Sequence, residues 1–198
     1  MAGHREALLE GAIRCIHEQG YSRTTARDLV AASGTNLASI GYHYGSKEAL
    51  LRQAIFESFR RWYMPLIESV AGRGLEASAR ELLGSLDEHR WLIVAHLEAV
   101  AEAPRDEELR AFIADRYGEF RAALAAQLGG GPAAEESAAQ IMALLDGTII
   151  QWLLGTGWQP DPNALLGAIR SAVATRRSRR RPRAARTPAS ARSAAAPN

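Results

Sequence analysis

Residues 24–51 read TTARDLVAASGTNLASIGYHYGSKEALL, and this stretch sets the expected fold of the N-terminal part of the chain. Its apolar residues recur with a helical period, but glycine interrupts the pattern at Gly34 and again at Gly45. Glycine adopts, at little cost, the left-handed backbone conformation that ends helices. The stretch therefore predicts three separate helices, where burial of a core alone would be satisfied by one long helix.

Each of these helices begins after a residue that can cap its N-terminus. Thr25 and Asp28 are spaced as a capping box, with Asp in place of the usual Glu. Asn36 and Ser46 carry oxygens that accept hydrogen bonds from the free backbone N–H groups of a first helical turn. We expect helices over residues 26–32, 37–44 and 46–64. Pro65 is expected to kink or end the third one.

The rest of the chain also follows a helical period, and no segment sustains the strict alternation of a strand. The remaining helices are expected up to Gly20 and over residues 75–87, 91–103, 106–128, 135–154 and 161–175. The sequence thus predicts an all-α chain of about nine helices. Its 198 residues, of which 47% are hydrophobic, are enough to bury a substantial core.

Charge is distributed unevenly along the chain. Eight arginines and no acidic residue lie in residues 176–198, so the other 175 residues carry a net charge of −6 although the whole chain carries +2. This low-complexity Arg/Ala/Pro tail is expected to be disordered. The high isoelectric point of about 9.0 belongs to the tail, and it does not indicate a basic folded surface.

Several classes of protein are disfavoured by the sequence. No run of 18 apolar residues is present, and the first residues do not resemble a secretory signal, so we expect a cytoplasmic protein without a membrane span. The single cysteine, Cys15, excludes an internal disulfide and is expected to be a buried structural thiol. No Ser/His/Asp, Cys/His or metal-spaced cluster is found, so neither an enzyme, a metal nor a cofactor is expected.

Two short helices joined by a glycine turn, with a supporting helix before them, are typical of the helix-turn-helix that places its second helix in the major groove of DNA. Ile40 and Tyr44 can point inward as anchors. Tyr42, His43 and Lys47 can reach phosphates. The candidate DNA-binding residues are Thr24, Thr25, Ala26, Arg27, Asn36, Leu37, Ala38, Ser39, Gly41, Tyr42, His43 and Lys47.

Alternatives remain for these residues. The short helices could be ordinary members of a helical bundle. His43 could ligate a metal, but no second ligand stands at a suitable spacing, which favours a phosphate contact. Lys47, the only lysine, could be a solvated residue at a helix start, although a cation there opposes the helix dipole unless a phosphate is bound.

The quoted stretch is similar to the DNA-binding region of the TetR family of bacterial transcriptional regulators. The matching features are the Thr-Thr start, the Ala-Ser-Gly turn, a Tyr-His-Tyr where the family commonly has Tyr-His-Phe, and Gly-Ser-Lys-Glu-Ala-Leu-Leu. The resemblance covers about the first 65 residues and implies a homodimer whose helical C-terminal domain often holds a small molecule. Gly41 departs from the family, which often has a large DNA-facing residue there.

A ligand pocket is expected among aromatic and polar residues of the C-terminal part: Trp62, His89, Trp91, His96, Glu98, Phe112, Arg116 and Tyr117. A buried polar group needs a partner, so His96 is either a ligand contact or a satisfied core histidine. Asp146 interrupts an apolar helix, and we expect it to form a hydrogen bond within a helix pair or across a dimer.

The expected domains are a helix-turn-helix domain over residues 1–48, a ligand-binding and dimerisation domain over residues 49–175, and the tail over residues 176–198. The helix over residues 46–64 links the first two. The two apolar helices near the end suit a four-helix bundle with a second subunit, although they could equally form an internal core.

The expected function is a transcriptional regulator, in most cases a repressor, that leaves a palindromic operator in double-stranded DNA when a small-molecule effector binds. Two alternatives are kept. One is a helical small-molecule-binding protein or enzyme. The other is a ligand-independent DNA binder that relies on the arginine tail, and it would not distinguish an operator from random DNA.

Overall fold

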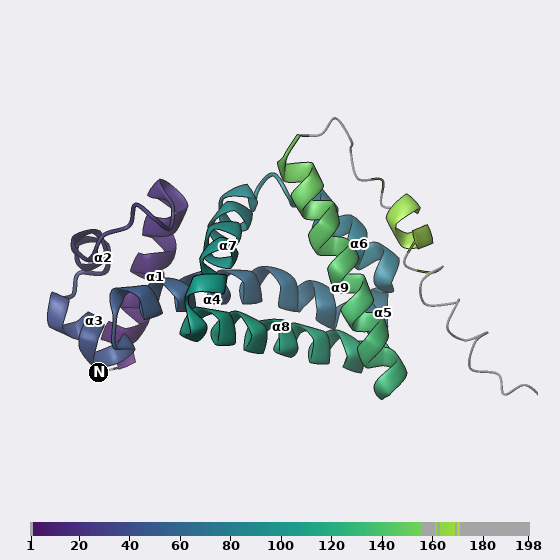
Figure 1. Ribbon diagram of the computed structural model, residues 1–198, viewed down its shortest axis with the longest axis horizontal. Coiled ribbons are helices and arrows are strands. Elements are labelled where there is room, and N and C mark those ends of the chain that lie inside the picture. The colour runs from purple at the N-terminus through teal and green to yellow at the C-terminus, as the bar shows by residue number, and fades with distance from the viewer. Residues whose placement is uncertain (1, 156–160, 162, 169, 171–198) are drawn as a thin grey trace, which may run out of the picture.

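The computed structural model describes residues 2–155, 161, 163–168 and 170 (Figure 1). These residues form helices and no strand, so the prediction of an all-α fold is confirmed. The expected tail over residues 176–198 lies outside the described residues. Of the expected helix over residues 161–175, residues 162, 169 and 171–175 also lie outside them, while 163–168 and 170 are helical. The elements are α1 (Ala2–Gln19), α2 (Ala26–Ser33), α3 (Leu37–Tyr44), α4 (Lys47–Glu68), α5 (Val70–Arg73), α6 (Leu75–Gly84), α7 (Arg90–Glu102), η1 (Ala103–Arg105), α8 (Glu107–Gln127) and α9 (Pro132–Leu153).

Helices α1, α2 and α3 form one end of the molecule (Figure 1). Helix α1 packs against both α2 and the start of α4, and the side chains of Leu8, Leu29 and Leu50 are fully buried between them. The capping box at Thr25 and Asp28 is present, with hydrogen bonds in both directions. Gly34 adopts the left-handed conformation at φ 66°, which ends α2 as the sequence predicts.

Helix α4 runs from this end into the rest of the molecule, with α8 beside it and α7 and α9 crossing the pair (Figure 1). It begins at the expected cap, where Ser46 Oγ accepts from the Ala49 N–H. The prediction that α4 could end at Pro65 is wrong, because the helix continues to Glu68 with the proline inside it. Leu66 and Ile67 are buried beyond the proline, and burying each stabilises the fold by about 1.5–3 kcal/mol, which offsets the lost backbone hydrogen bond.

Two clusters of buried apolar residues continue beyond the N-terminal end. One extends from α1 along one side of α4, from Leu50 to Leu66, to α6 and α7. The other lies between Phe56 and Ile67 of α4, α8 and α9, and includes Phe120, Ala138 and Ile141. Because α4 contributes to both clusters, a shift of this helix moves side chains in both halves of the molecule.

Candidate functional site

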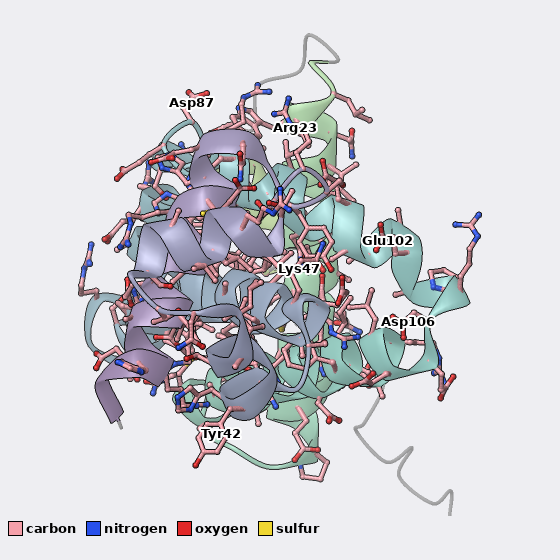
Figure 2. All side chains as sticks on the ribbon, turned by 90° about the vertical axis from the view of Figure 1, so that its left-hand side faces the viewer. Arg23, Tyr42, Lys47, Asp87, Glu102 and Asp106 are labelled. Carbon is pink, nitrogen blue, oxygen red and sulfur yellow. The ribbon has the colours of Figure 1, made fainter. Side chains whose placement is uncertain are left out.

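Helix α3 has one buried face and one exposed face. Ile40 is buried, whereas Leu37 and Tyr42 are 58% and 76% exposed. Figure 2 looks onto the end formed by α1, α2 and α3, and Tyr42 projects from it. Ser39, which was expected to approach base edges, is instead buried, and its hydroxyl donates to Asn36 Oδ1, the acceptor that caps α3. The exposed face of α3 is therefore carried by Leu37, Ala38, Gly41 and Tyr42.

The residues after Tyr42 divide between the surface and the interior. The ring of His43 contacts the Tyr42 ring edge-on at a centroid distance of 4.8 Å and is half-buried. The Tyr44 hydroxyl donates to the Arg5 carbonyl at 2.7 Å, and the Arg5 guanidinium lies 5.4 Å from the Tyr44 ring centroid. Tyr44 therefore ties α3 to α1, while Tyr42 and His43 remain available at the surface.

The N-termini of α2 and α4 meet beside α3. Lys47 Nζ donates to the Thr24 carbonyl at 3.3 Å and also lies 3.4 Å from the Glu48 carboxylate. Thr24 is buried and its hydroxyl donates to the Gly20 carbonyl, so it is a structural contact. Thr25, with its hydroxyl bound to Asp28, and Arg27 are exposed, and Ala26 is half-buried. The first backbone N–H groups of α2 are thus open to an anion at this end of the molecule.

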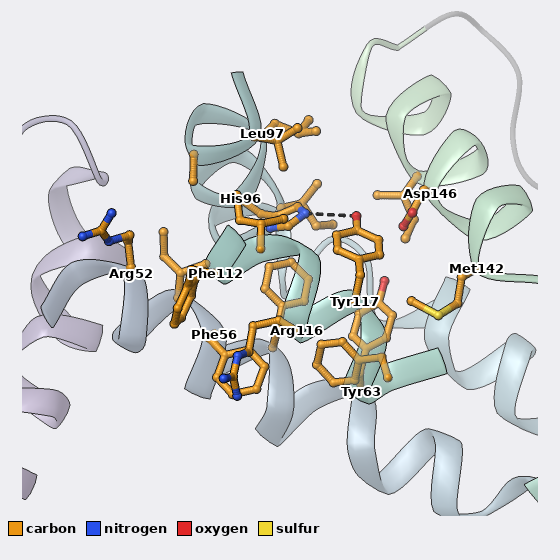
Figure 3. Close-up of a pocket in the computed structure, with 18 of the residues that line it drawn as sticks. Arg52, Phe56, Tyr63, His96, Leu97, Phe112, Arg116, Tyr117, Met142 and Asp146 are labelled. Atoms are coloured by element: carbon orange, nitrogen blue, oxygen red, sulfur yellow. Dashed lines mark hydrogen bonds between the residues drawn. The ribbon is translucent and has the colours of Figure 1, made fainter. Parts of the chain in front are cut away.

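The C-terminal part encloses a cavity of about 250 Å³ between α4, α7, α8 and α9. Four of the eight residues expected to form a ligand pocket line it: His96, Phe112, Arg116 and Tyr117 (Figure 3). Val100 and Ile150 line the cavity and are also exposed to solvent, so the cavity opens to the surface between α7 and α9.

The other four expected pocket residues do not line this cavity. The Trp62 indole N–H donates to Ser85 Oγ at 2.9 Å, and its ring stacks on His89 at 4.2 Å. Trp91 lies on α7 facing α1, 4.8 Å from the His17 ring. Glu98, one heptad further on the same face, accepts from the Ser22 hydroxyl. These four side chains attach the N-terminal helices and α6 to the core.

Polar groups in the cavity meet at Tyr117. The Tyr117 hydroxyl lies 3.3 Å from His96 Nε2, and it is also the neighbouring polar group that acts on the Asp146 carboxylate. Burial lowers the pKa of His96 to about 4. Burial raises the pKa of Asp146 to about 6, against the opposing effect of the Tyr117 hydrogen bond. Burial raises the pKa of both Tyr63 and Tyr117, and the negative charge of Asp146 raises it further by a smaller amount.

Two family models match the chain. The model described as "Bacterial regulatory proteins, tetR family" matches residues 8–54, and the one described as "Tetracyclin repressor-like, C-terminal domain" matches residues 73–176, more than half of the chain. The chain belongs to the TetR family. The family resemblance of the helix-turn-helix stretch is thereby confirmed.

Curated proteins similar to this TetR-family chain are named as repressors. It is 35% identical over 107 residues to the HTH-type transcriptional repressor AcnR of Corynebacterium efficiens, covering 54% of each chain. It is 32% identical over 124 residues to the HTH-type transcriptional repressor Rv1474c of Mycobacterium tuberculosis, covering 62% of this chain and 63% of that protein. The matches thus span from about half to just under two thirds of the length of these relatives.

Solved structures share the fold over nearly their whole length. A TetR transcription regulator from Haloarcula marismortui has a TM-score of 0.64 and 21% identity, covering 90% of this chain and 98% of that chain. The multidrug binding protein EbrR, complexed with proflavin, has a TM-score of 0.65 and 21% identity, covering 86% of this chain and 99% of that chain. At this level of identity the likeness establishes the helical architecture.

Arg52 of this TetR-family chain was not expected at the cavity from its sequence. It is buried in α4, and its guanidinium lies 3.5 Å from Asp106 and 3.4 Å from Glu108 at the start of α8. It also lines a second hollow, shared with His43 and Tyr44 at the end of α3. A charged residue among the apolar positions of α4 was the available signal. Arg52 thus connects the cavity wall, the start of α8 and the end of the molecule formed by α1, α2 and α3.

Two further findings concern the described part of this family member. None of its helices combines the length and hydropathy needed to cross a membrane. In the same residues, no group of three or more His, Cys, Asp or Glu side chains is arranged to hold a metal ion.

Proposed function

We propose that this TetR-family chain is a homodimeric, sequence-specific DNA-binding regulator that represses transcription until a small molecule in the α4–α7–α8–α9 cavity releases it from its operator. The observation that carries the proposal is α3, a two-turn helix with its own cap that is anchored inward by Ile40 and Tyr44 and exposes Leu37 and Tyr42. Repression is supported by the relatives, which are named as repressors over the parts that match.

The proposed DNA contacts follow from the geometry of this end. Leu37, Ala38, Gly41 and Tyr42 face base edges, and the N-terminal turns of α2 and α4 bind phosphates. Within the proposed domains, residues 1–48 bind DNA and residues 49–175 bind ligand and dimerise. A dimer must hold its two α3 helices about 34–36 Å apart to meet successive major grooves of an inverted repeat. The expected cytoplasmic location and the lack of enzymatic activity belong to the same proposal.

The proposed dimer forms through α9 and the helical residues after it. Leu154 is 71% exposed at the C-terminal end of α9. Large apolar side chains at such positions lose contact with water when a second copy packs against them. This supports a four-helix bundle made from two copies of the same helix pair.

The test begins by selecting bound sequences from a random DNA library with the full-length protein. The recovered site is then titrated in gel shifts with the wild type, Tyr42→Ala and Arg121→Ala. Tyr42→Ala is expected to weaken specific binding by about 10- to 100-fold, the size of a lost base contact. It should leave thermal unfolding unchanged, because Tyr42 is an exposed residue. Arg121→Ala removes an exposed charge on α8 and is expected to bind normally.

Two results would overturn this function. One is an equal affinity of Tyr42→Ala and the wild type for the selected site, which would exclude α3 as the reading helix. The other is equal binding of selected and random DNA by the wild type. That outcome is expected of a non-specific binder that relies on its arginine tail, whose affinity falls steeply with salt.

A further inference from the structure

Asp146 is a carboxylate in an otherwise apolar part of the cavity wall. It comes from α9, where Met142, Ile149 and Ile150 line the same cavity. Its polar neighbour is the Tyr117 hydroxyl, and among the described residues it forms no ion pair. A partly buried carboxylate without a cation is costly, and it is stabilised when a ligand supplies the missing positive charge.

The two arginines in the cavity wall are already paired. Arg52 lies against Asp106 and Glu108 of α8. Arg116 pairs with Glu119 and lies over the Phe56 ring, with its guanidinium carbon 4.6 Å from the ring centroid. His96, the third basic group, is neutral at physiological pH because burial lowers its pKa to about 4. Both arginines are therefore already paired and His96 is uncharged, so none of the three neutralises Asp146.

Aromatic rings form much of the remaining wall. The faces of aromatic rings carry partial negative charge and attract cations, while their bodies bind apolar groups. Figure 3 shows Tyr63 and Tyr117 on the side of the cavity toward Asp146. The aromatic residues of the wall are Phe56, Phe59, Tyr63, Phe112, Tyr117 and Phe120. Such a wall suits a flat apolar ligand that carries a single positive charge.

The volume of the cavity limits the size of that ligand. A dry apolar cavity of about 150 Å³ in a protein core holds one benzene ring. The cavity here, at about 250 Å³, has room for roughly two fused rings with a short substituent. Its opening at Val100 and Ile150 gives such a molecule a route of entry.

We propose that the cavity binds a lipophilic monocation of about two fused rings, with its ammonium group paired to Asp146 and its rings stacked among the aromatic side chains. This inference deepens the proposed function, since it takes the cavity to be the effector site, and it names the chemical class of the effector. An anionic ligand would instead be held by Arg116, whose Nε–H is buried and has no hydrogen-bond partner in the described structure.

Three probes of nearly equal shape distinguish these cases: naphthylmethylamine, naphthalenemethanol and naphthoate, all substituted at the same ring position. Their binding to the full-length protein, without DNA, is measured by isothermal titration calorimetry at neutral pH. The amine is expected to bind about tenfold more tightly than the alcohol, the size of one charge-assisted hydrogen bond in a partly buried site. Naphthoate is expected to bind most weakly.

The variant Asp146→Asn is expected to reduce the affinity for the amine to that for the alcohol. The control Glu135→Gln removes an exposed carboxylate from the same helix and should keep the wild-type preference. Tighter binding of naphthoate would overturn the proposal, as would an unchanged preference in Asp146→Asn or no binding of the amine at millimolar concentration. These measurements contain no DNA. They therefore test the ligand class even if the protein proves not to bind an operator.

A pH titration tests the same pairing in the wild-type protein. Asp146 faces Tyr117 and Arg116 from α8, His96 from α7 and Tyr63 from α4. Between about pH 5 and 7.5 the two tyrosines stay neutral, as does His96 with its pKa of about 4. Affinity for the amine is expected to fall as the pH drops through about 6, where Asp146 gains a proton, while affinity for the alcohol stays constant. A flat amine profile would contradict the pairing.

Discussion

His96 and Asp146 both contact Tyr117, and burial moves their pKa values in opposite directions. The folded protein holds His96 neutral, with a pKa of about 4 against an unperturbed value near 6.5. It holds Asp146 with a pKa of about 6 against an ordinary value of 3.8. In each case burial disfavours the charged form, so each side chain costs stability in the pH range where its ionised form dominates.

The two residues should therefore change the stability of the fold in opposite senses between pH 4 and 6. As the pH falls, the folded state takes up a proton at Asp146 before the unfolded chain does, which raises the free energy of unfolding. Over the same range the unfolded chain protonates its histidine first, which lowers that free energy. Asp146→Asn is expected to stabilise the protein at pH 7 by on the order of 3 kcal/mol. In this variant the fall in the free energy of unfolding that His96 causes at lower pH should remain. Urea unfolding at a series of pH values measures both effects.

A substitution of His96, the other residue of the pair, supplies the control. His96→Gln removes the opposing histidine, so its free energy of unfolding should rise relative to that of the wild type as the pH falls toward 4. Parallel pH profiles for the two variants would contradict the assignment of opposite shifts to these side chains.

The cavity residues show what the sequence can predict about a binding site. His96, Phe112, Arg116 and Tyr117 were chosen as polar or aromatic residues on predicted helices, and they line the cavity. Trp91 was chosen for the same reason, but it points toward α1, because the face of α7 that meets α8 depends on how the helices cross. Residue type was readable from the sequence, whereas the rotation of each helix was not.

Helix ends were predicted more closely than helix faces. The bounds of α3, and the caps at Thr25 and Ser46, follow from hydrogen bonds between residues three apart, so local sequence contains the whole signal. Pro65 was misjudged because the buried contacts of Leu66 and Ile67 come from distant parts of the chain. Local rules therefore predict where a helix starts better than whether tertiary packing extends it.

Two helical glycines provide a test of the contact between α1 and α2. A Cβ added at Gly11 would lie 3.1 Å from Ser33 N and Cβ, closer than such atoms normally approach, because α1 and α2 pack tightly there. A Cβ at Gly41 would meet nothing within 4 Å. Gly41→Ala is expected to stabilise the protein by up to about 1 kcal/mol through helix propensity. Gly11→Ala is expected to destabilise it by about 1 kcal/mol or more through overpacking.

Thermal and urea unfolding of the two glycine variants measure this difference directly. Equal stabilities would show that α2 moves away from α1 at little cost, which would contradict a rigid contact between them. Operator binding by Gly41→Ala reports separately on DNA: a loss of affinity without a loss of stability would show that DNA approaches α3 closely at this position.

For the whole molecule, the proposed dimer depends on the exposed apolar end of α9. Leu154→Asp places a carboxylate where a second copy is expected to pack, and burying an unpaired charge is costly. The dimer dissociation constant, measured by sedimentation equilibrium, is expected to rise by at least about tenfold. Leu37→Asp is the matched control, because Leu37 is a similarly exposed leucine on α3, and it should remain dimeric. An unchanged dimer in Leu154→Asp would place the interface elsewhere.

Coupling between the cavity and α3 is expected to pass through Arg52. This residue joins α4 to the start of α8, lines the cavity, and borders the hollow next to His43 and Tyr44. A ligand that shifts α8 relative to α4 therefore disturbs the ion pairs of Arg52 and, with them, the position of α3. Such couplings typically amount to about 1–3 kcal/mol, or 5- to 150-fold in affinity.

Thermodynamic linkage makes this coupling measurable in both directions. Saturating naphthylmethylamine should weaken operator binding by the same factor by which operator DNA weakens binding of the amine. Arg52→Met removes the ion pairs to Asp106 and Glu108 but keeps an apolar side chain of similar length, so it is expected to bring that factor close to one. Arg60→Met, which alters an exposed residue of the same helix, should keep the wild-type factor. If Arg52→Met also keeps the wild-type ratio between operator affinities without and with the amine, Arg52 does not transmit the signal. The coupling then runs through other contacts between α4 and α8.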